Sequence, residues 1–474
     1  MRWIIPQSDA HQVQALASAL RIRPLTARIL LNRGLSTPEA ALRYLRPSLD
    51  DLHDPFLMAG MRAAVDRLKA AIGRREKILI YGDYDVDGTT SVVILKKAIE
   101  LAGGQADFHV PHRLKDGYGM RTEVIEQAAK NGVTLIISVD TGIRAQEVVR
   151  AAAALGIDVI VTDHHLPEEE LPPAVAVLNP NQPGCSYPEK NLCGAGVTFK
   201  LVHALLRTLP WTEEKRLRML RSFLKLVAIA TVADVVPLTG ENRVIVKHGL
   251  DGLDRVTNPG LRALLDVAGL GAGKRPTAGE VAFRVAPRIN AAGRMAHAEN
   301  VIHMFLTEDP EKARSLAQEL HDLNHDRQQT EADMVRTVLE ICVACPVVAS
   351  DAALVFSGAN WHRGVVGIVA SRLVERFCRP VFVLSEEDGQ AQGSGRSISA
   401  FHLLDALEAM PELFKRFGGH RQAAGLSMSA DRVGEFRERF NAYAAERLTA
   451  EDFVPQIGID AVLSLKELDE VGVA

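Results

Sequence analysis

The sequence predicts an α/β protein with a parallel sheet in its N-terminal half and a second, smaller α/β unit in its C-terminal half. Short β-branched runs alternate with helical segments between about residues 77 and 161, a rhythm typical of βαβ units. The alternation resumes from about residue 353, after a charged helical tract. At 474 residues the chain is also longer than one hydrophobic core usually organises, so we expect about three domains.

The predicted elements follow in order along the chain. Residues 24–45 have helical apolar spacing and form a small N-terminal helical segment. A charged tract over residues 310–340, with few glycines or prolines, predicts a long connecting helix. From residue 457 the chain has one strand-like and one helix-like piece, which indicates an incomplete third module. The other predicted strands are 77–81, 134–139, 157–161, 353–356 and 381–384, and the other predicted helices are 89–103, 144–156, 365–377 and 431–448.

Composition limits the function classes that remain. The formal net charge is −4, from 55 basic and 59 acidic residues, so any nucleic-acid site must be a local patch. Aromatic residues make up only 5%, which argues against binding mainly through many stacking platforms. No stretch has the length of a membrane span and the first residues lack a signal-peptide pattern, so we expect a cytoplasmic protein that does not enter a membrane.

Three carboxylates follow the first strand of the predicted parallel sheet. The strand at 77–81 continues into the motif GDYDVDG, which places Asp83, Asp85 and Asp87 within five residues. Such anions repel one another at neutral pH unless protons or cations neutralise them, so the cluster indicates a divalent metal with oxygen ligands. A solvated acidic loop is the alternative.

The next two strands also end in ligand-type side chains. Asp140 follows the strand at 134–139, and His164 and His165 follow the strand at 157–161. The ligand crevice of an open parallel sheet lies beyond the carboxyl ends of its strands, so we expect these motifs to converge there. Asp234 stands in an apolar run, where a charge is costly unless it is paired or metal-bound. This expected convergence argues against the alternative that His164 and His165 are an ordinary histidine pair on the surface or at a helix cap.

The motifs resemble a known superfamily in both content and order. GDYDVDG, DTG, TDHH and ADVVPL are similar to motifs I to IV of the DHH phosphoesterases. The segments NRGLSTPEAALRYL, PHRLKDGYG, APRINAAGRM, LNHDRQ and FGGHRQAAGLS narrow the resemblance to the RecJ family of single-strand-specific 5′→3′ DNA exonucleases. The resemblance implies an N-terminal helical segment at 1–72, a DHH domain at 73–305, a connector helix at 306–345, a smaller α/β DHHA1 domain at 346–450 and the start of an OB-fold at 451–474.

The same resemblance implies two divalent cations, Mn²⁺ by preference or Mg²⁺. Asp83 and Asp85 would hold one ion, whereas Asp87, His164 and Asp234 would hold the other. Asp140 would bridge both ions, and His165 would sit beside the scissile phosphate, so these two are the predicted catalytic residues. Paired ions of this kind activate water for attack on phosphorus. Tyr81 occupies a position where other superfamily members have a metal-binding histidine, and Asp83 would take over that role.

The resemblance also implies phosphate contacts from both domains. Glycines beside cationic side chains let backbone N–H groups approach an anion, although an ordinary tight turn is the alternative for the glycine-rich pieces of the second domain. The predicted substrate-binding residues are Arg113, Arg288, Asn290 and Arg294 in the first domain and Ser394, Arg396, Gly419 and His420 in the second.

The implied function is removal of nucleotides from the 5′ end of single-stranded DNA in recombination and repair. The resemblance further implies a monomer that works with a single-strand binding protein and a RecQ-type helicase. Two alternatives stay open. One is a phosphodiesterase of the same superfamily that acts on short oligoribonucleotides or cyclic dinucleotides. The other is a non-catalytic nucleic-acid-binding scaffold resembling Cdc45, in which the metal site is degraded. This alternative is disfavoured because Asp85, Asp87, Asp140, His164, His165 and Asp234 are all present.

Overall fold

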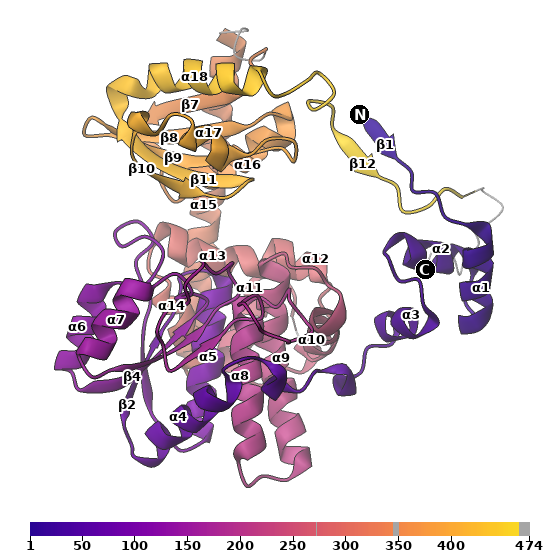
Figure 1. Cartoon of the computed structure of the whole chain (residues 1–474), viewed down its shortest axis with the longest axis vertical. Coiled ribbons are helices and arrows are strands. Elements are labelled where there is room, and N and C mark those ends of the chain that lie inside the picture. The colour runs from indigo at the N-terminus through magenta and orange to yellow at the C-terminus, as the bar shows by residue number, and fades with distance from the viewer. Residues whose placement is uncertain (272, 345–349, 464–474) are drawn as a thin grey trace. The chain divides into compact units, whose positions relative to one another are not determined.

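A five-stranded parallel sheet organises residues 43–325, one of the two units into which the chain divides (Figure 1). The computed structural model describes residues 1–271, 273–344 and 350–463. The strands lie in the order β3-β2-β4-β5-β6. Their bounds are β2 (Lys77–Tyr81), β3 (Ala106–His109), β4 (Val133–Val139), β5 (Asp158–Thr162) and β6 (Ala176–Leu178). The predicted strands at 77–81, 134–139 and 157–161 are therefore confirmed.

Both faces of this sheet are buried, as expected when helices connect parallel strands. Ile78 and Ile80 of β2 belong to one apolar cluster, whereas Leu79 and Tyr81 of the same strand belong to another. Successive side chains of a strand point to opposite faces, so the two clusters lie on the two sides of the sheet. The first side is covered by helices that include α4 (Met61–Gly73), α5 (Val86–Leu101) and α8 (Gly194–Thr208), and the second by α6 (Thr122–Lys130) and α7 (Gln146–Ala154).

The remaining helices of this unit extend the first cluster. They include a π-helical segment at Val281–Val285 that leads directly into α13. The helix α15 (Pro310–Ala344) begins in this unit and confirms the predicted long helix. The other helices are α9 (Glu213–Ala233), α10 (Gly240–Asp251), α11 (Pro259–Val267), α12 (Ala278–Glu280), α13 (Ala286–Met295) and α14 (Glu299–Leu306).

The second unit combines residues 1–42 with residues 326–474 and contains a mixed sheet in the order β10-β11-β9-β8-β7. Within this sheet β7 and β8 pair in parallel, at the start of the α/β unit predicted over residues 353–448, and the other pairs are antiparallel. The elements are β7 (Leu354–Ala359), α16 (Val366–Phe377), β8 (Val381–Glu387), β9 (Gln390–Arg396), α17 (Leu403–Glu408), β10 (Phe414–Gly419), β11 (Ala423–Ser429) and α18 (Val433–Ala445).

The two ends of the described chain pair with each other in this second unit. β1 (Arg2–Ile4), which the sequence did not predict, pairs in parallel with β12 (Gln456–Gly458). Asn32 donates a hydrogen bond to the Asp460 carbonyl at 2.7 Å, so the N-terminal helices also contact this segment. The strand-like piece predicted after residue 457 overlaps β12, whereas the helix-like piece lies outside the described residues. The N-terminal helices are α1 (Ala10–Leu20), α2 (Pro24–Asn32) and α3 (Pro38–Leu45).

Candidate metal centre

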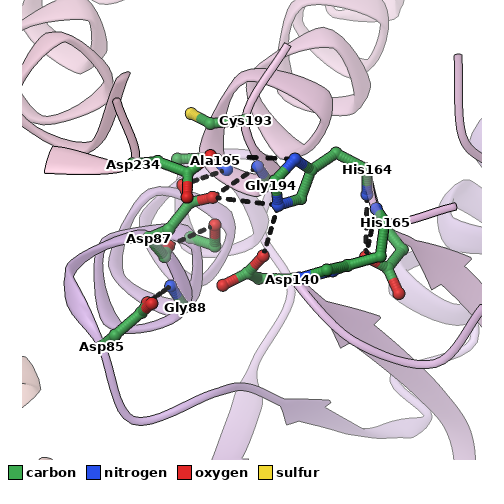
Figure 2. Close-up of polar contacts among 12 residues, drawn as sticks. Asp85, Asp87, Gly88, Asp140, His164, His165, Cys193, Gly194, Ala195 and Asp234 are labelled. Atoms are coloured by element: carbon green, nitrogen blue, oxygen red, sulfur yellow. Dashed lines mark hydrogen bonds and ion pairs between the residues drawn. The ribbon is translucent and has the colours of Figure 1, made fainter. Parts of the chain in front are cut away.

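The predicted metal ligands lie at the carboxyl edge of the parallel sheet. β2 leads into the loop that carries Asp83 and Asp85, β4 leads into Asp140, and β5 leads through Asp163 into His164. Because β2, β4 and β5 are neighbours in the sheet, these loops are neighbours too. Asp234 comes from elsewhere, since it caps the C-terminal end of α9. Figure 2 shows Asp87, Asp140, His164 and Asp234 turned toward one another.

Three overlapping groups of donor atoms result from this arrangement. Within each group the ligand atoms lie within 4.8 Å of one another. Asp140 and His164 each belong to two groups, so the groups are contiguous. The three groups are Asp83, Asp85 and Asp140; Asp87, His164 and Asp234; and Asp140, His164 and His165. All six predicted ligands therefore lie in one cluster.

The electrostatics of this cluster fit bound cations. Burial, together with the charge of Asp85, raises the pKa of Asp83 well above its usual value, and burial together with Asp87 does the same for Asp140. Burial and Asp87 raise the pKa of Asp234 to about 8. Asp83 Oδ1 and Asp140 Oδ1 are buried and accept no hydrogen bond. Asp140 Oδ1 does lie 3.3 Å from His164 Nε2. Buried carboxylate oxygens that accept no hydrogen bond are costly, and divalent cations with oxygen ligands would compensate them.

Backbone amides hold two of the acidic side chains in place (Figure 2). Asp85 is the N-cap residue of α5 and accepts a hydrogen bond from Gly88 N at 3.0 Å. Asp87 accepts hydrogen bonds from Gly194 N at 2.6 Å and from Ala195 N at 2.7 Å, both at the start of α8. Charge-assisted hydrogen bonds of this kind are short and strong, so these carboxylates have fixed orientations.

His165 is held by residues that the sequence reasoning missed. Its Nδ1 lies 2.7 Å from Asp163 Oδ1, and Asp163 is completely buried. The Tyr118 hydroxyl donates to the Asp140 carbonyl at 3.2 Å and lies 3.2 Å from His165 Nδ1. Asp163 is part of the TDHH motif and lies two residues before His165, so the acid in that motif was a signal for this local contact. Tyr118 is part of PHRLKDGYG, but its contact with His165 is tertiary and leaves no signal in the sequence.

The predicted substrate-binding residues of this unit differ in whether they contact the loop that carries the acidic ligands. Arg113 stacks over the ring of Tyr84, with its guanidinium carbon 4.7 Å from the ring centre. Asn290 Oδ1 accepts a hydrogen bond from Val86 N at 3.2 Å, so α13 contacts the acidic loop and carries Arg294 one turn further on. Arg288, on the same helix, instead contacts His321 Nδ1 at 3.1 Å and the Arg284 carbonyl.

The predicted phosphate-binding residues of the second unit lie toward one end of its mixed sheet. Ser394 of β9 pairs with Gly425 of β11, which in turn pairs with Gly418 of β10. Gly419 has a φ of 149°, a conformation that favours glycine, and His420 N donates to the Ala423 carbonyl at 2.7 Å.

The beginning of α16 lies beside two of these residues. A Cβ at Gly367 would lie 3.1 Å from Arg396 Nη2 and 3.6 Å from Ser394 Oγ. A helix N-terminus beside a hydroxyl and a guanidinium is an arrangement that suits a phosphate group.

Comparison with known proteins places this geometry in a family. Residues 77–231 match the DHH family, N-terminal domain, and residues 347–446 match the DHHA1 domain. The single-stranded-DNA-specific exonuclease RecJ of Bacillus subtilis is 42% identical over the whole chain, which spans 59% of that relative's length. RecJ of Dickeya dadantii is 41% identical over 98% of this chain and 81% of the relative.

Solved structures agree with the sequence comparisons. RecJ from Thermus thermophilus in complex with Mn²⁺ has a TM-score of 0.83 and 34% identity, over 98% of this chain and 65% of that one. A manganese-bound exonuclease RecJ has a TM-score of 0.73 and 36% identity, over 85% of this chain and 100% of that one. Among the described residues, no helix is both long and apolar enough to cross a bilayer. From the motifs, the fold and these matches, the chain belongs to the RecJ family of DHH proteins.

Proposed function

We propose that this chain is a metal-dependent exonuclease that degrades single-stranded DNA in the 5′→3′ direction. The observation that carries the proposal is the set of three overlapping donor groups at the sheet edge, with two buried carboxylate oxygens that accept no hydrogen bond. The relatives' name supports the choice of substrate, since the matches extend over nearly the whole chain. The DNA specificity itself is taken from those relatives.

The donor groups suggest how two divalent cations, Mn²⁺ or Mg²⁺, would be held. Asp83 and Asp85 would bind one ion, and Asp87, His164 and Asp234 the other, with Asp140 shared between them. Carboxylate oxygens favour Mn²⁺ and Mg²⁺, and the imidazole tilts the preference toward Mn²⁺. When bound, such ions lower the pKa of water and neutralise charge that develops on phosphate oxygens.

His165 would act on the substrate directly. Its Nδ1 faces Asp163, which assigns a proton to Nδ1 and leaves Nε2 for a substrate oxygen. Burial alone would lower the pKa of His165, but the hydrogen bond to Asp163 raises it above the ordinary value. A ring that keeps its proton can donate a hydrogen bond to a non-bridging phosphate oxygen or to the leaving oxygen.

Phosphate contacts would come from both units. In the first unit, Arg113 and the α13 residues Arg288, Asn290 and Arg294 would contact the DNA backbone; Arg113 and Asn290 have the stronger support, because they contact the loop at residues 84–86. In the second unit, Ser394 and Arg396 beside α16, together with Gly419 and His420, would bind a phosphate.

The wider setting of this activity is also part of the proposal. We infer a monomer of the cytoplasm that works in recombination and DNA repair with a single-strand binding protein and a RecQ-type helicase. We also propose five parts of the chain: an N-terminal helical segment, a DHH domain, a connector helix, a DHHA1 domain and the start of an OB-fold. Their bounds are 1–72, 73–305, 306–345, 346–450 and 451–474, respectively.

A direct assay tests the proposal. Single-stranded DNA labelled at either end, duplex DNA, RNA and a cyclic dinucleotide are each incubated with the chain in Mn²⁺, Mg²⁺ or EDTA. We expect release of mononucleotides from the 5′ end of single-stranded DNA, with Mn²⁺ or Mg²⁺ and not with EDTA. Preference for short RNA or the cyclic dinucleotide would replace this proposal with a phosphodiesterase. DNA binding without hydrolysis in any metal would support a scaffold.

A further inference from the structure

The first turn of α8 is capped by a carboxylate from another part of the chain. Its N-cap residue is Cys193, whose side chain makes no capping hydrogen bond. Helices usually begin with Ser, Thr, Asp or Asn, whose side-chain oxygens accept hydrogen bonds from the free amides of the first turn. Here Asp87, 107 residues before Gly194, accepts from Gly194 N through Oδ2 and from Ala195 N through Oδ1. The helix N-terminus also stabilises negative charge on this carboxylate.

The same turn packs directly against Asp140. A Cβ at Gly194 would lie 2.5 Å from Asp140 Oδ1 and 2.7 Å from Asp140 Cβ, distances that real side chains do not show. Asp140 itself has a φ of 59°, a conformation that costs free energy for a residue with a side chain and persists only where the surroundings fix it. Only glycine at position 194 lets the helix approach closely enough to help fix Asp140.

We propose that the first turn of α8 is the element that positions Asp87 and Asp140 relative to each other, with Gly194 as the positioning residue. Asp87 and Asp140 belong to different donor groups, which meet at His164. One turn of helix holds the first carboxylate by two hydrogen bonds and the second by close packing, so it sets the spacing between the groups. This inference rests on the proposed metal binding and adds a determinant of metal affinity outside the ligands themselves.

The chain offers a matched pair of variants to test this role. Gly194→Ala and Gly196→Ala make the same change two residues apart in one helix, but the nearest atoms to a Cβ at Gly196 would be those of the Leu192 side chain, at 3.2 Å and beyond. Binding is measured from the electron paramagnetic resonance signal of free Mn²⁺ during titration of chelator-treated protein. We expect Gly194→Ala to bind Mn²⁺ about 10–100-fold more weakly, the usual effect of losing a residue that supports metal ligands, and Gly196→Ala to keep wild-type affinity.

Thermal unfolding in EDTA separates positioning from folding. We expect Gly194→Ala to remain folded without metal, because the nearest atoms that the new Cβ would meet all belong to the side chain of Asp140. If it does not fold, replacement of Ala195 by its α-hydroxy acid analogue through nonsense suppression decides the question. The resulting ester replaces the N–H that Asp87 Oδ1 accepts with an oxygen and adds no bulk at this buried position. Loss of that charge-assisted hydrogen bond should weaken Mn²⁺ binding by about 10-fold.

The outcomes distinguish this inference from the function on which it rests. Wild-type protein that binds no Mn²⁺ would refute the proposed metal site itself. Wild-type binding together with unchanged affinity in a folded Gly194→Ala variant or in the folded Ala195 ester variant would overturn the positioning role and leave the metal site intact.

Discussion

The metal-ligand cluster and the phosphate-binding end of the second sheet are built in different ways. Asp87 and Asp140 are each only 2% exposed, and they are held by backbone amides and helix packing from distant parts of the chain. Ser394 and Arg396 are partly exposed on one strand, and His420 is exposed at the end of another. The first region has a fixed geometry suited to cations, whereas the second presents side chains that can adjust to a flexible phosphate backbone.

This difference predicts unequal effects of mutation. Removal of one carboxylate from the buried cluster takes away a ligand of the cations that would neutralise the remaining carboxylates. Removal of one cation from the second region takes away a single phosphate contact and leaves its neighbours in place. Mutations at the metal cluster should therefore act on turnover, and mutations in the second unit on affinity.

The largest effect is expected at the shared carboxylate. Asp140→Asn keeps the size of the side chain but removes the charge that both donor groups use, so we expect the rate of single-strand degradation to fall by at least about 100-fold. Mn²⁺ titration should show weaker binding as well. Asp107→Asn on β3, an exposed acid outside the cluster, is the control and should change neither quantity. An Asp140→Asn variant with more than a few per cent of wild-type activity would contradict the sharing of Asp140.

The sequence predicted the parts of the site that follow from strand order. Asp83, Asp85, Asp140 and His164 stand directly after predicted strands, and the rule that ligands gather at carboxyl ends was enough to bring them together. The position of Asp234 at the end of α9 could not be derived, because the apolar run around it fits either a buried strand or a buried helix.

Other features could not be predicted for a different physical reason, because they depend on contacts between distant segments. The contacts of Asp87 with α8 and the pairing of β1 with β12 each join segments more than 100 residues apart, and local patterns carry no information about such distances. The contact of Tyr118 with His165 spans 47 residues but is equally tertiary. The two-sided burial of the parallel sheet was predictable, whereas the order of the mixed sheet was not, since its antiparallel strands can pair in several ways.

A smaller effect is expected from the phosphate-binding region. Arg396→Ala should weaken binding of single-stranded DNA by about 10-fold and lower the slope of log affinity against log salt by about 0.7, because one phosphate contact is lost. The turnover number at saturating DNA should stay near that of the wild type. Arg447→Ala, in the turn that follows α18, where the arginine pairs with Glu446, removes the same charge from the same unit and serves as the control. A fall in turnover at saturating DNA, without loss of affinity, would place Arg396 in the chemical step.

The smallest effect concerns the stability of the metal-free protein and its dependence on pH. The pKa of Asp234 is about 8 in the folded chain, against an ordinary value of 3.8, so between these values the folded state keeps a proton that the unfolded state releases. Stability in EDTA should therefore fall as the pH rises from about 4 to about 8, and the raised pKa values of Asp83 and Asp140 act in the same direction. We expect the Tm in EDTA to fall by at least about 2 °C between pH 5.5 and pH 8.

Mn²⁺ should reverse the trend, because it replaces the protons as the compensating charge, and Asp234→Asn should flatten it. A Tm that rises with pH in EDTA would show that these carboxylates are already ionised without metal, and would remove the electrostatic contrast between the two regions.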